Sequence, residues 1–552
     1  MQLTRRAFTG GAFGLAFASQ LGTRALAQVS TNLSGALAAI RAYAEAQLAF
    51  FNLPGLTLGL TAPGGFATVL NFGYANADAR TAIGPDTLFQ IGSISKSMTA
   101  TVIHQLASER KLGLDSRVSA VLPAIPLPVG SAVTVQHLLD HVAGLPDSAP
   151  VFPEGGLWTA YPPGAHWHYS NTGYDILGKI AEHAGGKPLD RLLMERIFRP
   201  LGMVRTRGAI VGSDRTLYAQ GYEAADPAAV FARGVRLAPA AWVDVTFGAG
   251  SVASTAEDMT RFMRALADAA QGRGALGLSP QQAKALVGRA VPSDTPGMSY
   301  GNGLMHVGNA GRSYLHHTGG MVSFSSAFHV DVASGVGAFA SSTLSAFAEY
   351  RPRLITRFAV DALTNVIEGR ALPSPPPMDV PLPNAAAYAG TYVGPAGAFE
   401  VRAGSPLTIV TRDGQAPLQP WGGDIFRTLL PGFRQFSLMF ERRNGAIAGA
   451  SWGPSSYLKQ GSGGELAASN AALAQLAGRY VDDSPWYGTA IVVERGGKLW
   501  IGTETPMTKI GDNLWRVGQE SWSPERASFA NFIDGRPQTF VFSGEKFLRH
   551  DI

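Results

Sequence analysis

The sequence contains no cysteine among its 552 residues. Disulfide bonds, thiolate nucleophiles and cysteine-ligated zinc are therefore excluded. Charge is also scarce, since Asp, Glu, Lys and Arg make up only 15% of the chain, and Lys and Arg form no run along it. A surface that binds polyphosphate needs clustered basic side chains, so we expect no nucleic-acid partner.

Long hydrophobic runs are also missing. No segment after the N-terminal region reaches the roughly 20 apolar residues that a membrane-spanning helix needs, although 46% of the residues are hydrophobic. An apolar chain of this length buries several cores rather than remaining disordered. We therefore expect a folded protein with more than one domain and no transmembrane segment.

The N-terminal region has the composition of an export signal. It begins with the pair Arg5-Arg6, contains no acidic residue up to Ala27, and continues through an apolar, glycine-rich stretch to an A-x-A tripeptide that ends at Ala27. This order is typical of a twin-arginine signal, with an amphipathic N-terminal helix as the alternative. We expect residues 1–27 to be removed and the protein to be periplasmic or secreted.

Apolar spacing from residue 33 to 368 indicates mixed secondary structure. Helices before, between and after strands favour an α+β or α/β domain. The helices are expected over 33–51, 96–111, 134–142, 174–185 and 256–271, and strands over 56–62, 314–320 and 323–332.

The C-terminal third differs in pattern, because helical periodicity nearly disappears after a proline-rich stretch. An internal repeat appears there: AGTYV at 389–393 matches AGRYV at 477–481, 88 residues later. Two related, small all-β domains of barrel-like type are therefore predicted. The expected domains are 28–369, 384–459 and 471–552, with linkers at 370–383 and 460–470.

The segment FQIGSISKSMT places Ser93 three residues before Lys96, at the start of a predicted helix. Both side chains then lie on one helix face. A lysine that is desolvated beside a serine has a lowered pKa and can help to remove the hydroxyl proton. The backbone N–H of Ser93 could also bind a developing oxyanion. Taken alone, the spacing favours a capping serine followed by a solvated lysine.

Two further motifs favour the catalytic interpretation. One is Tyr169-x-Asn171, on a turn before a predicted helix, and the other is His317-Thr318-Gly319-Gly320, in a predicted strand. In this order, Ser93-x-x-Lys96 and these two motifs resemble the serine beta-lactamase and penicillin-binding protein superfamily, specifically its class C-like branch. Segments 138–147 and 248–262 resemble further segments of that branch.

The resemblance implies a lactamase-like α+β fold, with an antiparallel sheet flanked by helices and a helical subdomain. It also implies a set of roles: Ser93 as the acyl-enzyme nucleophile, Lys96 as its hydrogen-bonded partner, Tyr169 as general base and later acid, Asn171, His317, Thr318 and Gly319 as orienting residues, and the N–H groups of Ser93 and Gly320 as the oxyanion hole. No cofactor and no metal are implied.

His317 departs from the pattern of this superfamily, because true lactamases mostly carry a lysine there. A cationic lysine holds the lactam carboxylate, whereas an imidazole is largely neutral at pH 7. The departure argues against efficient lactamase activity but not against hydrolysis.

Other motifs favour structural roles. Gly449–Gly453 matches G-x-S-x-G, but the strand-rich context predicts a β-strand edge rather than a nucleophile elbow. His137 and His141 are four residues apart, yet the glutamate of H-E-x-x-H is absent, so packing or capping is expected. His166, His168 and His316 either shape the proposed cleft or satisfy loop carbonyls.

The expected protein is thus a serine hydrolase that acts through an acyl-enzyme. A catalytic domain followed by two repeated β-domains resembles the D-aminopeptidase architecture, in which the added domains limit access. This favours short peptides or amides, including those with D- or unusual residues. An esterase or lactonase is the alternative, a beta-lactamase or DD-peptidase is less expected, and a non-catalytic binder of peptidoglycan fragments is least expected. The oligomeric state stays open.

Overall fold

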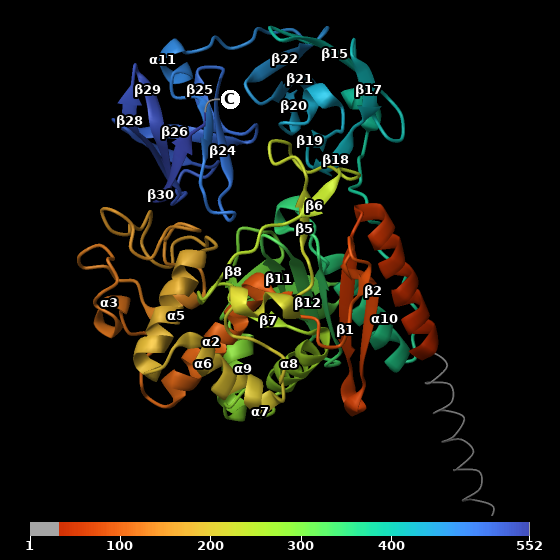
Figure 1. The fold of residues 1–552 in the computed structure, drawn as a ribbon, viewed down its shortest axis with the longest axis vertical. Coiled ribbons are helices and arrows are strands. Elements are labelled where there is room, and N and C mark those ends of the chain that lie inside the picture. The colour runs from red at the N-terminus through yellow and green to blue at the C-terminus, as the bar shows by residue number, and fades with distance from the viewer. Residues whose placement is uncertain (1–32, 551–552) are drawn as a thin grey trace, which may run out of the picture.

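The structure, a computed structural model, describes residues 33–550 (Figure 1). A mixed part, residues 33–369, is followed by two units made mainly of strands. The leader expected at residues 1–27 lies outside the described residues. Within the described part, no helix combines the length and apolarity that crossing a bilayer requires.

A nine-stranded antiparallel sheet forms the centre of the mixed part, in the order β3-β2-β1-β13-β12-β11-β10-β9-β8. Its N-terminal strand β1 pairs with β13, so that Leu56 lies opposite Ser342 and the sheet joins the two ends of this part. The strands are β1 (Gly55–Thr61), β2 (Ala67–Asn76), β3 (Thr81–Ala82), β8 (Val291–Pro292), β9 (Met298–Gly301), β10 (Leu304–Asn309), β11 (Arg312–Gly320), β12 (Ser325–Asp331) and β13 (Gly337–Ser342).

Helices cover both faces of this sheet and form a subdomain beside it. They are a helix over 33–51, α2 (Ser95–Ser108), α3 (Val118–Val121), α4 (Val135–Leu139), α5 (Asn171–Gly185), α6 (Leu189–Leu193), α7 (Arg199–Leu201), α8 (Ala256–Ala270), α9 (Pro280–Gly288) and α10 (Arg353–Ile367). The period of two along β13 separates the faces. Phe339 packs in the core beneath α8, whereas Ala338 and Ala340 pack in the core formed with α10 and helix 33–51.

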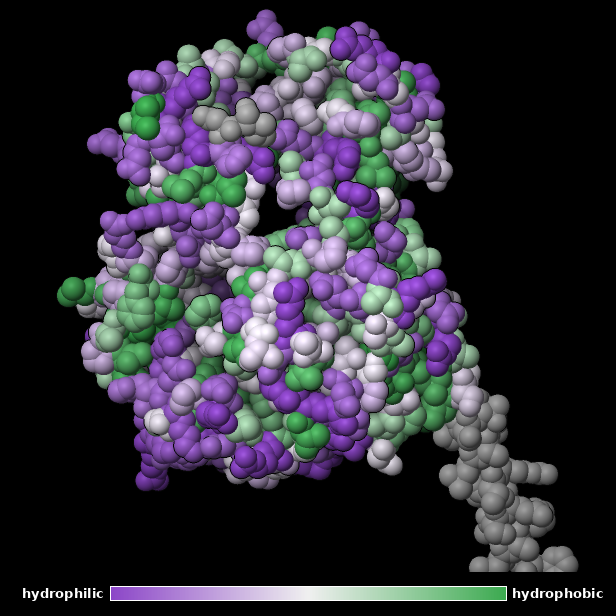
Figure 2. Space-filling view, viewed as in Figure 1, coloured by the Kyte–Doolittle hydropathy of each residue, from purple (hydrophilic) through white to green (hydrophobic). Residues whose placement is uncertain are grey.

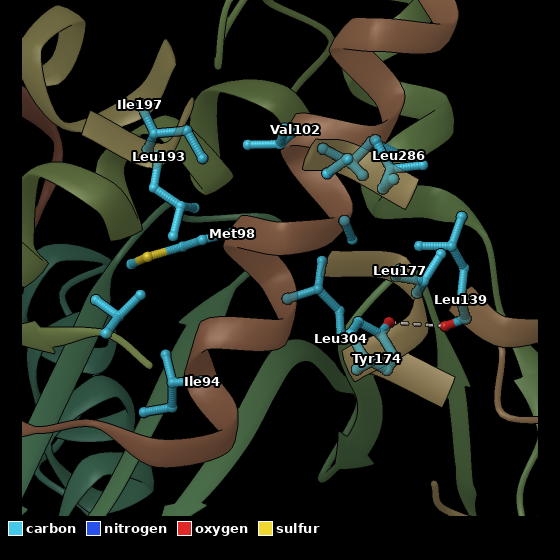
Figure 3. Packing of buried hydrophobic residues seen from close by; sticks show 14 of the residues in the cluster. Ile94, Met98, Val102, Leu139, Tyr174, Leu177, Leu193, Ile197, Leu286 and Leu304 are labelled. Atoms are coloured by element: carbon cyan, nitrogen blue, oxygen red, sulfur yellow. Dashed lines mark hydrogen bonds between the residues drawn. The ribbon is translucent and has the colours of Figure 1, made fainter. Parts of the chain in front are cut away.

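A helical subdomain surrounds α2, whose residues are almost all buried. Ile94, Met98 and Val102 recur at helical spacing and pack among leucine and isoleucine side chains of the neighbouring helices (Figure 3). The Tyr174 hydroxyl donates a hydrogen bond to the Leu139 carbonyl at 2.9 Å, which joins α5 to α4. Two short sheets lie outside the central one: β4 (Phe89–Gln90) with β7 (Ala253–Ser254), and β5 (Tyr222–Ala224) with β6 (Leu237–Pro239).

Two expected helices have different limits. The one expected from residue 174 begins at Asn171, because the Ser170 hydroxyl caps the first turn by accepting from Gly173 N–H at 3.0 Å. The one expected over 134–142 ends at Leu139, since the chain turns at His141, whose φ is 60°.

The first β unit is a nine-stranded antiparallel sheet in the order β17-β16-β15-β14-β22-β21-β20-β19-β18. Only Leu418 separates its two edge strands, so the sheet curls into a nearly closed barrel. Its strands are β14 (Gly390–Gly394), β15 (Gly397–Arg402), β16 (Thr408–Thr411), β17 (Gly414–Pro417), β18 (Gln419–Gly422), β19 (Ile425–Arg427), β20 (Leu438–Arg443), β21 (Ala446–Trp452) and β22 (Ser455–Lys459).

The second unit, the C-terminal barrel, closes fully. It follows the short α11 (Ala471–Ala474), and its strands are β23 (Gly478–Val481), β24 (Thr489–Arg495), β25 (Lys498–Ile501), β26 (Thr505–Gly511), β27 (Leu514–Val517), β28 (Arg526–Ile533), β29 (Arg536–Phe542) and β30 (Glu545–Arg549).

The tyrosines of the 88-residue repeat occupy equivalent positions in the two units. Each hydroxyl donates to the carbonyl four residues earlier, Tyr392 to Tyr388 and Tyr480 to Leu476, both at 2.7 Å. Each tyrosine also lies on the first strand of its unit, which pairs with the last strand. The repeat thus identifies, in each unit, the strand at which the beginning and the end of the unit pair.

The prediction that Gly449–Gly453 lies at a strand edge is wrong in one respect. Ser451 lies on β21, which pairs with β20 on one side and β22 on the other, so it is an interior strand. The Ser451 side chain is fully buried, and its hydroxyl donates to the Glu441 carboxylate. No strand-to-helix turn presents this serine.

The three parts contact one another around an opening that is visible in the space-filling view (Figure 2). The buried Arg427 guanidinium of the first β unit pairs with Glu349 of the mixed part at 2.5 Å. Gly453 N–H donates to the Thr503 hydroxyl at 3.0 Å, which links the two β units. The C-terminal barrel contacts the mixed part through Tyr487, Lys546 and loop 518–525, the last of which is described below.

Candidate functional site

Ser93 and Lys96 meet where a turn enters α2. Ser93 lies in a short 3-10 turn, Gly92–Ile94, and Lys96 follows in the first turn of the helix. The Lys96 ammonium is 3.1 Å from the Ser93 hydroxyl oxygen. The spacing of three residues therefore brings the two groups together, as the sequence predicts.

Lys96 is fully buried, yet its amine has a partner for every proton. Besides Ser93, it donates to Asn171 Oδ1 at 2.6 Å and to the Ala249 carbonyl at 3.0 Å. Burial lowers the pKa of Lys96 to about 7, against the opposing effect of the Asp175 carboxylate. A substantial fraction of this amine is therefore neutral near pH 7 and can accept a proton.

Tyr169 lies next to Ser93 and Lys96. Lys96 Nζ is 4.8 Å from the centre of the Tyr169 ring, and the phenol is hydrogen-bonded to Ser93. Burial raises the pKa of Tyr169 well above that of an ordinary phenol, although the Ser93 hydrogen bond opposes this. The phenol is thus protonated at neutral pH and is placed to donate its proton.

The end of β11 passes unusually close to the serine turn. A Cβ at Gly319 would lie 1.9 Å from the Ile91 carbonyl oxygen, and one at Gly92, where φ is +55°, would lie 2.7 Å from Gly320 N. Only glycine fits at 92 and 319. This approach brings the backbone around Ser93 next to Gly320, where their two N–H groups could bind one oxyanion.

His317 is buried beside these groups and is neutral. Burial lowers its pKa to about 3, and the charge of Lys96 lowers it further. Its Nε2 is 3.1 Å from the Tyr300 hydroxyl, and its Nδ1 is 2.6 Å from the Thr318 carbonyl oxygen. The group that stands where lactamases carry lysine therefore supplies no positive charge at pH 7.

Asn171, the first residue of α5, connects Lys96 to a partly buried carboxylate in the cavity wall. Its amide nitrogen donates to Asp147 Oδ1 at 3.0 Å and to the Ser148 hydroxyl at 3.3 Å. Burial raises the pKa of Asp147 to about 6, the nearby Glu525 raises it further, and Lys96 opposes the shift. The amide orientation of Asn171 is thereby fixed, with its oxygen toward Lys96.

A cavity of about 1080 Å³ opens onto Ser93. The mixed part and the C-terminal barrel both line it. Its wall includes Tyr169, Asn171, His317, Thr318 and Gly320, apolar side chains such as Phe152, Phe247 and Phe347, the barrel residues Trp486, Tyr487, Phe542 and Ser543, and the carboxylates of Asp147, Asp175, Glu182, Glu525 and Glu545. The site is therefore shared between parts that are distant in the sequence.

Sequence reasoning missed several groups of this site. The Ala249 carbonyl lies in segment 248–262, but no motif rule marks a backbone acceptor. Arg351 also lines the cavity, and a Cβ at Gly320 would lie 2.7 Å from its guanidinium. It donates to the Ala346 and Tyr350 carbonyls, and within residues 33–550 no carboxylate pairs with it. Tyr300 and Glu525 carry no sequence signal either.

The other histidines have structural contacts. His137 Nδ1 accepts from Thr134 N–H at 3.1 Å and completes a capping box of α4. His141 Nδ1 accepts from Ser170 N–H at 3.1 Å, next to the Tyr169 ring. Across residues 33–550, no three His, Asp or Glu side chains are arranged to hold a metal ion.

Comparisons with known proteins agree with this geometry. The model of the Beta-lactamase family matches residues 40–360. A beta-lactamase of Pseudomonas fluorescens is 32% identical over 174 residues, which are 29% of this chain and 48% of that protein. Penicillin-binding protein 4* of Bacillus subtilis is 33% identical over 156 residues, which are 25% of this chain and 34% of that protein. The chain thus spans at most half the length of these two relatives.

Among solved structures, an octameric penicillin-binding protein homologue from Pyrococcus abyssi has a TM-score of 0.54 and 22% identity, and the match covers 77% of this chain and 100% of that one. At that identity, the likeness concerns the fold. The mixed part therefore has the expected lactamase-like α+β fold.

Proposed function

Because this chain belongs to the beta-lactamase family, we propose that it is a serine hydrolase in which Ser93 forms an acyl-enzyme. The observation that carries the proposal is the buried Lys96 amine, which lies 3.1 Å from the Ser93 hydroxyl and has a pKa of about 7. A hydroxyl becomes a nucleophile when a base accepts its proton, and a neutral amine can do so.

The geometry supports the following sequence of proton transfers. Neutral Lys96 accepts the Ser93 proton while Oγ attacks the substrate carbonyl, and the N–H groups of Ser93 and Gly320 bind the oxyanion. Tyr169 then donates its phenolic proton to the leaving amine and regains one from Lys96. The sequence-based prediction made Tyr169 the general base, but the pKa directions favour Lys96 for the first step.

We assign short peptides and amides as the substrate class. The cavity of about 1080 Å³ is large enough for a short peptide and combines apolar walls with a few polar groups. The Arg351 guanidinium, next to Gly320, could bind a carboxylate or carbonyl of the substrate. An esterase or lactonase is the alternative, since the same residues attack esters more easily. We also propose that residues 1–27 direct export and that residues 370–383 and 460–470 are the linkers between the domains.

Intact-mass spectrometry tests the assignment. The protein would be mixed with panels of short peptide amides, p-nitrophenyl esters and penicillins, and quenched on the millisecond to minute scale. We expect an acyl adduct on Ser93 and turnover of at least one amide. Turnover of esters alone would favour the esterase alternative, and binding without any adduct would favour a non-catalytic binder.

The pH dependence of the reaction should follow Lys96. Because only the neutral amine accepts the Ser93 proton, kcat/KM should fall as pH decreases through about 7 and level off above it. A pH profile on one small ester, from pH 5 to 9, measures this. A flat profile across pH 6–8 would contradict the role given to Lys96.

Penicillin hydrolysis should be slow, because neutral His317 cannot hold the lactam carboxylate as an ammonium does. His317→Lys should raise the rate of acylation by penicillin about tenfold, which corresponds to only about 1.4 kcal/mol of added interaction. Stopped-flow acylation measures it, with His317→Gln as the uncharged control. Wild-type penicillin turnover near the diffusion limit would contradict this view of His317.

A further inference from the structure

The C-terminal barrel contacts the loops that lead into Tyr169 and Asn171. One part of this contact is made by its loop 518–525, between β27 and β28. The Trp158 indole N–H donates to the Pro524 carbonyl at 2.8 Å. The His166 ring stacks on Trp522, with centroids 4.6 Å apart and planes within 5°. An ordered, partly aromatic interface therefore holds this loop against the mixed part.

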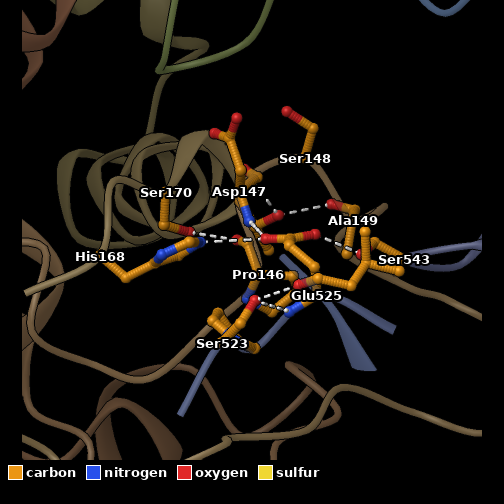
Figure 4. Close-up of polar contacts among 12 residues, drawn as sticks. Pro146, Asp147, Ser148, Ala149, His168, Ser170, Ser523, Glu525 and Ser543 are labelled. Carbon is orange, nitrogen blue, oxygen red and sulfur yellow. Dashed lines mark hydrogen bonds and ion pairs between the residues drawn. The ribbon is translucent and has the colours of Figure 1, made fainter. Parts of the chain in front are cut away.

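Glu525, at the end of this loop, is the polar centre of the interface (Figure 4). Its side chain is only 14% exposed. Oε1 accepts from Asp147 N–H at 2.7 Å and lies 3.0 Å from His168 Nε2, while Oε2 accepts from the Ser543 hydroxyl. Burial acts to raise the pKa of Glu525, but the contacts from His168 and Ser543 outweigh it and lower that pKa. The carboxylate is thus ionised and binds two segments of the mixed part at once.

Three hydrogen bonds connect the first of these segments, at Asp147, to the Ser93 hydroxyl. Asp147, whose N–H is held by Glu525, accepts from the Asn171 amide at 3.0 Å. Asn171 in turn accepts from Lys96 at 2.6 Å, and Lys96 lies 3.1 Å from the Ser93 hydroxyl. A change in the position of the Asp147 backbone would therefore move the acceptor that orients the Lys96 amine.

The second segment carries the phenol. His168, held by Glu525 through Nε2, directly precedes Tyr169. Its backbone N–H also donates to the His141 carbonyl at 2.8 Å, and the His141 ring lies 4.4 Å from that of Tyr169. One carboxylate of the barrel thus contacts both loop segments that place the proton-transfer groups.

We infer that Glu525 is a positioning residue for acylation of Ser93, so that the C-terminal barrel completes the active site as well as covering it. The inference rests on the proposed function, since it concerns the same acylation step. It requires the acceptor oxygen of Glu525 at its present place rather than a negative charge in the barrel. Fixed geometry of this kind matters because a shift of about 1 Å can cost roughly 100-fold in rate.

Three substitutions of Glu525 in the full-length protein separate the acceptor from the charge. Glu525→Gln keeps an oxygen for Asp147 N–H and His168, and should retain kcat within about fivefold. Glu525→Asp keeps the charge but withdraws the oxygen by one methylene, and Glu525→Ala removes both. These two should lower kcat for p-nitrophenyl acetate by about 30- to 100-fold, with KM changed by less than about threefold.

The matched control is Glu154→Gln, across the same interface. Glu154 is 83% exposed, pairs with Lys546 at 2.8 Å, and takes part in none of the hydrogen bonds described above. It should behave as wild type, because an exposed ion pair contributes little. Thermal unfolding and protease resistance would show that the barrel remains docked in every variant.

The outcomes are distinct. Loss of kcat in Glu525→Asp and Glu525→Ala, with recovery in Glu525→Gln and folding intact, supports the inference. Wild-type kcat in folded Glu525→Ala would overturn it, and so would an increase in KM alone, which would make Glu525 a substrate contact. If Glu525→Ala does not fold, the other two variants are decisive. A higher kcat for Glu525→Gln than for Glu525→Asp supports the inference, and the reverse order overturns it. Absence of any Ser93 adduct in the wild type would instead contradict the proposed function, and the inference with it.

Discussion

Ser93→Ala should abolish acyl-adduct formation and lower kcat by at least about 10⁴-fold on every substrate that the wild type turns over. The physical reason is that the variant retains the oxyanion N–H groups and the cavity but has no atom to bond the acyl carbon. Removing one hydroxyl that is hydrogen-bonded to Lys96 leaves the packing around α2 intact, so the protein should fold. Intact-mass spectrometry and steady-state kinetics measure the loss.

Ser451→Ala is the matched control for this prediction, because Ser451 belongs to the second serine motif. It lies on the interior strand β21, is fully buried and donates to Glu441. The variant should keep its rate within about tenfold and lose some stability, since the Glu441 carboxylate loses a partner. A folded but inactive Ser451→Ala protein would show that the nucleophile has been misassigned.

Lys96→Met should lower kcat by about 10³-fold while leaving the fold intact. General-base catalysis contributes roughly 10² to 10⁴ in rate, and Met has nearly the shape of Lys but no basic nitrogen. Replacing a buried charge by an apolar group of similar volume is often neutral for stability. The measurements are kcat on a small ester and the melting temperature, and the decrease of rate below about pH 7 should disappear.

Lys111→Met provides the control, since Lys111 is 44% exposed and pairs with Glu109 just after the end of α2. Its activity should match that of the wild type. A Lys96→Met protein that is folded and retains a tenth of the wild-type rate would transfer the base role to another group, with Tyr169 as the first candidate.

Much of the local structure follows from spacing in the sequence. The period of the apolar residues predicts the helix at 33–51 and those that become α2, α5 and α8, because one buried face per helix leaves a regular signature. The S-x-x-K spacing brings Ser93 and Lys96 together without help from distant segments. The loss of helical periodicity and the repeat at Tyr392 and Tyr480 predict two β units, because each barrel needs the same closing strand.

Other features depend on contacts between distant residues, which leave no such signature. Helix ends are set by single residues that periodicity does not detect: a positive φ at His141 and the Ser170 cap shift those ends by about three residues. Ser451 looks like an edge or an elbow in sequence, but pairing with β20 and β22 makes it interior.

The sequence by itself determined the fold class and the pairing of Ser93 with Lys96, because these depend on spacing within single elements and on a family pattern. Only the tertiary structure decided which groups tune them. The Ala249 carbonyl accepts from Lys96, the Asp147 carboxylate acts on its pKa, and the barrel residue Glu525 accepts from Asp147 N–H, from 153, 51 and 429 positions away from Lys96 in the chain. Such contacts are fixed by packing and burial, which shift the pKa of Lys96 and orient its proton, and neither effect is encoded in any local motif.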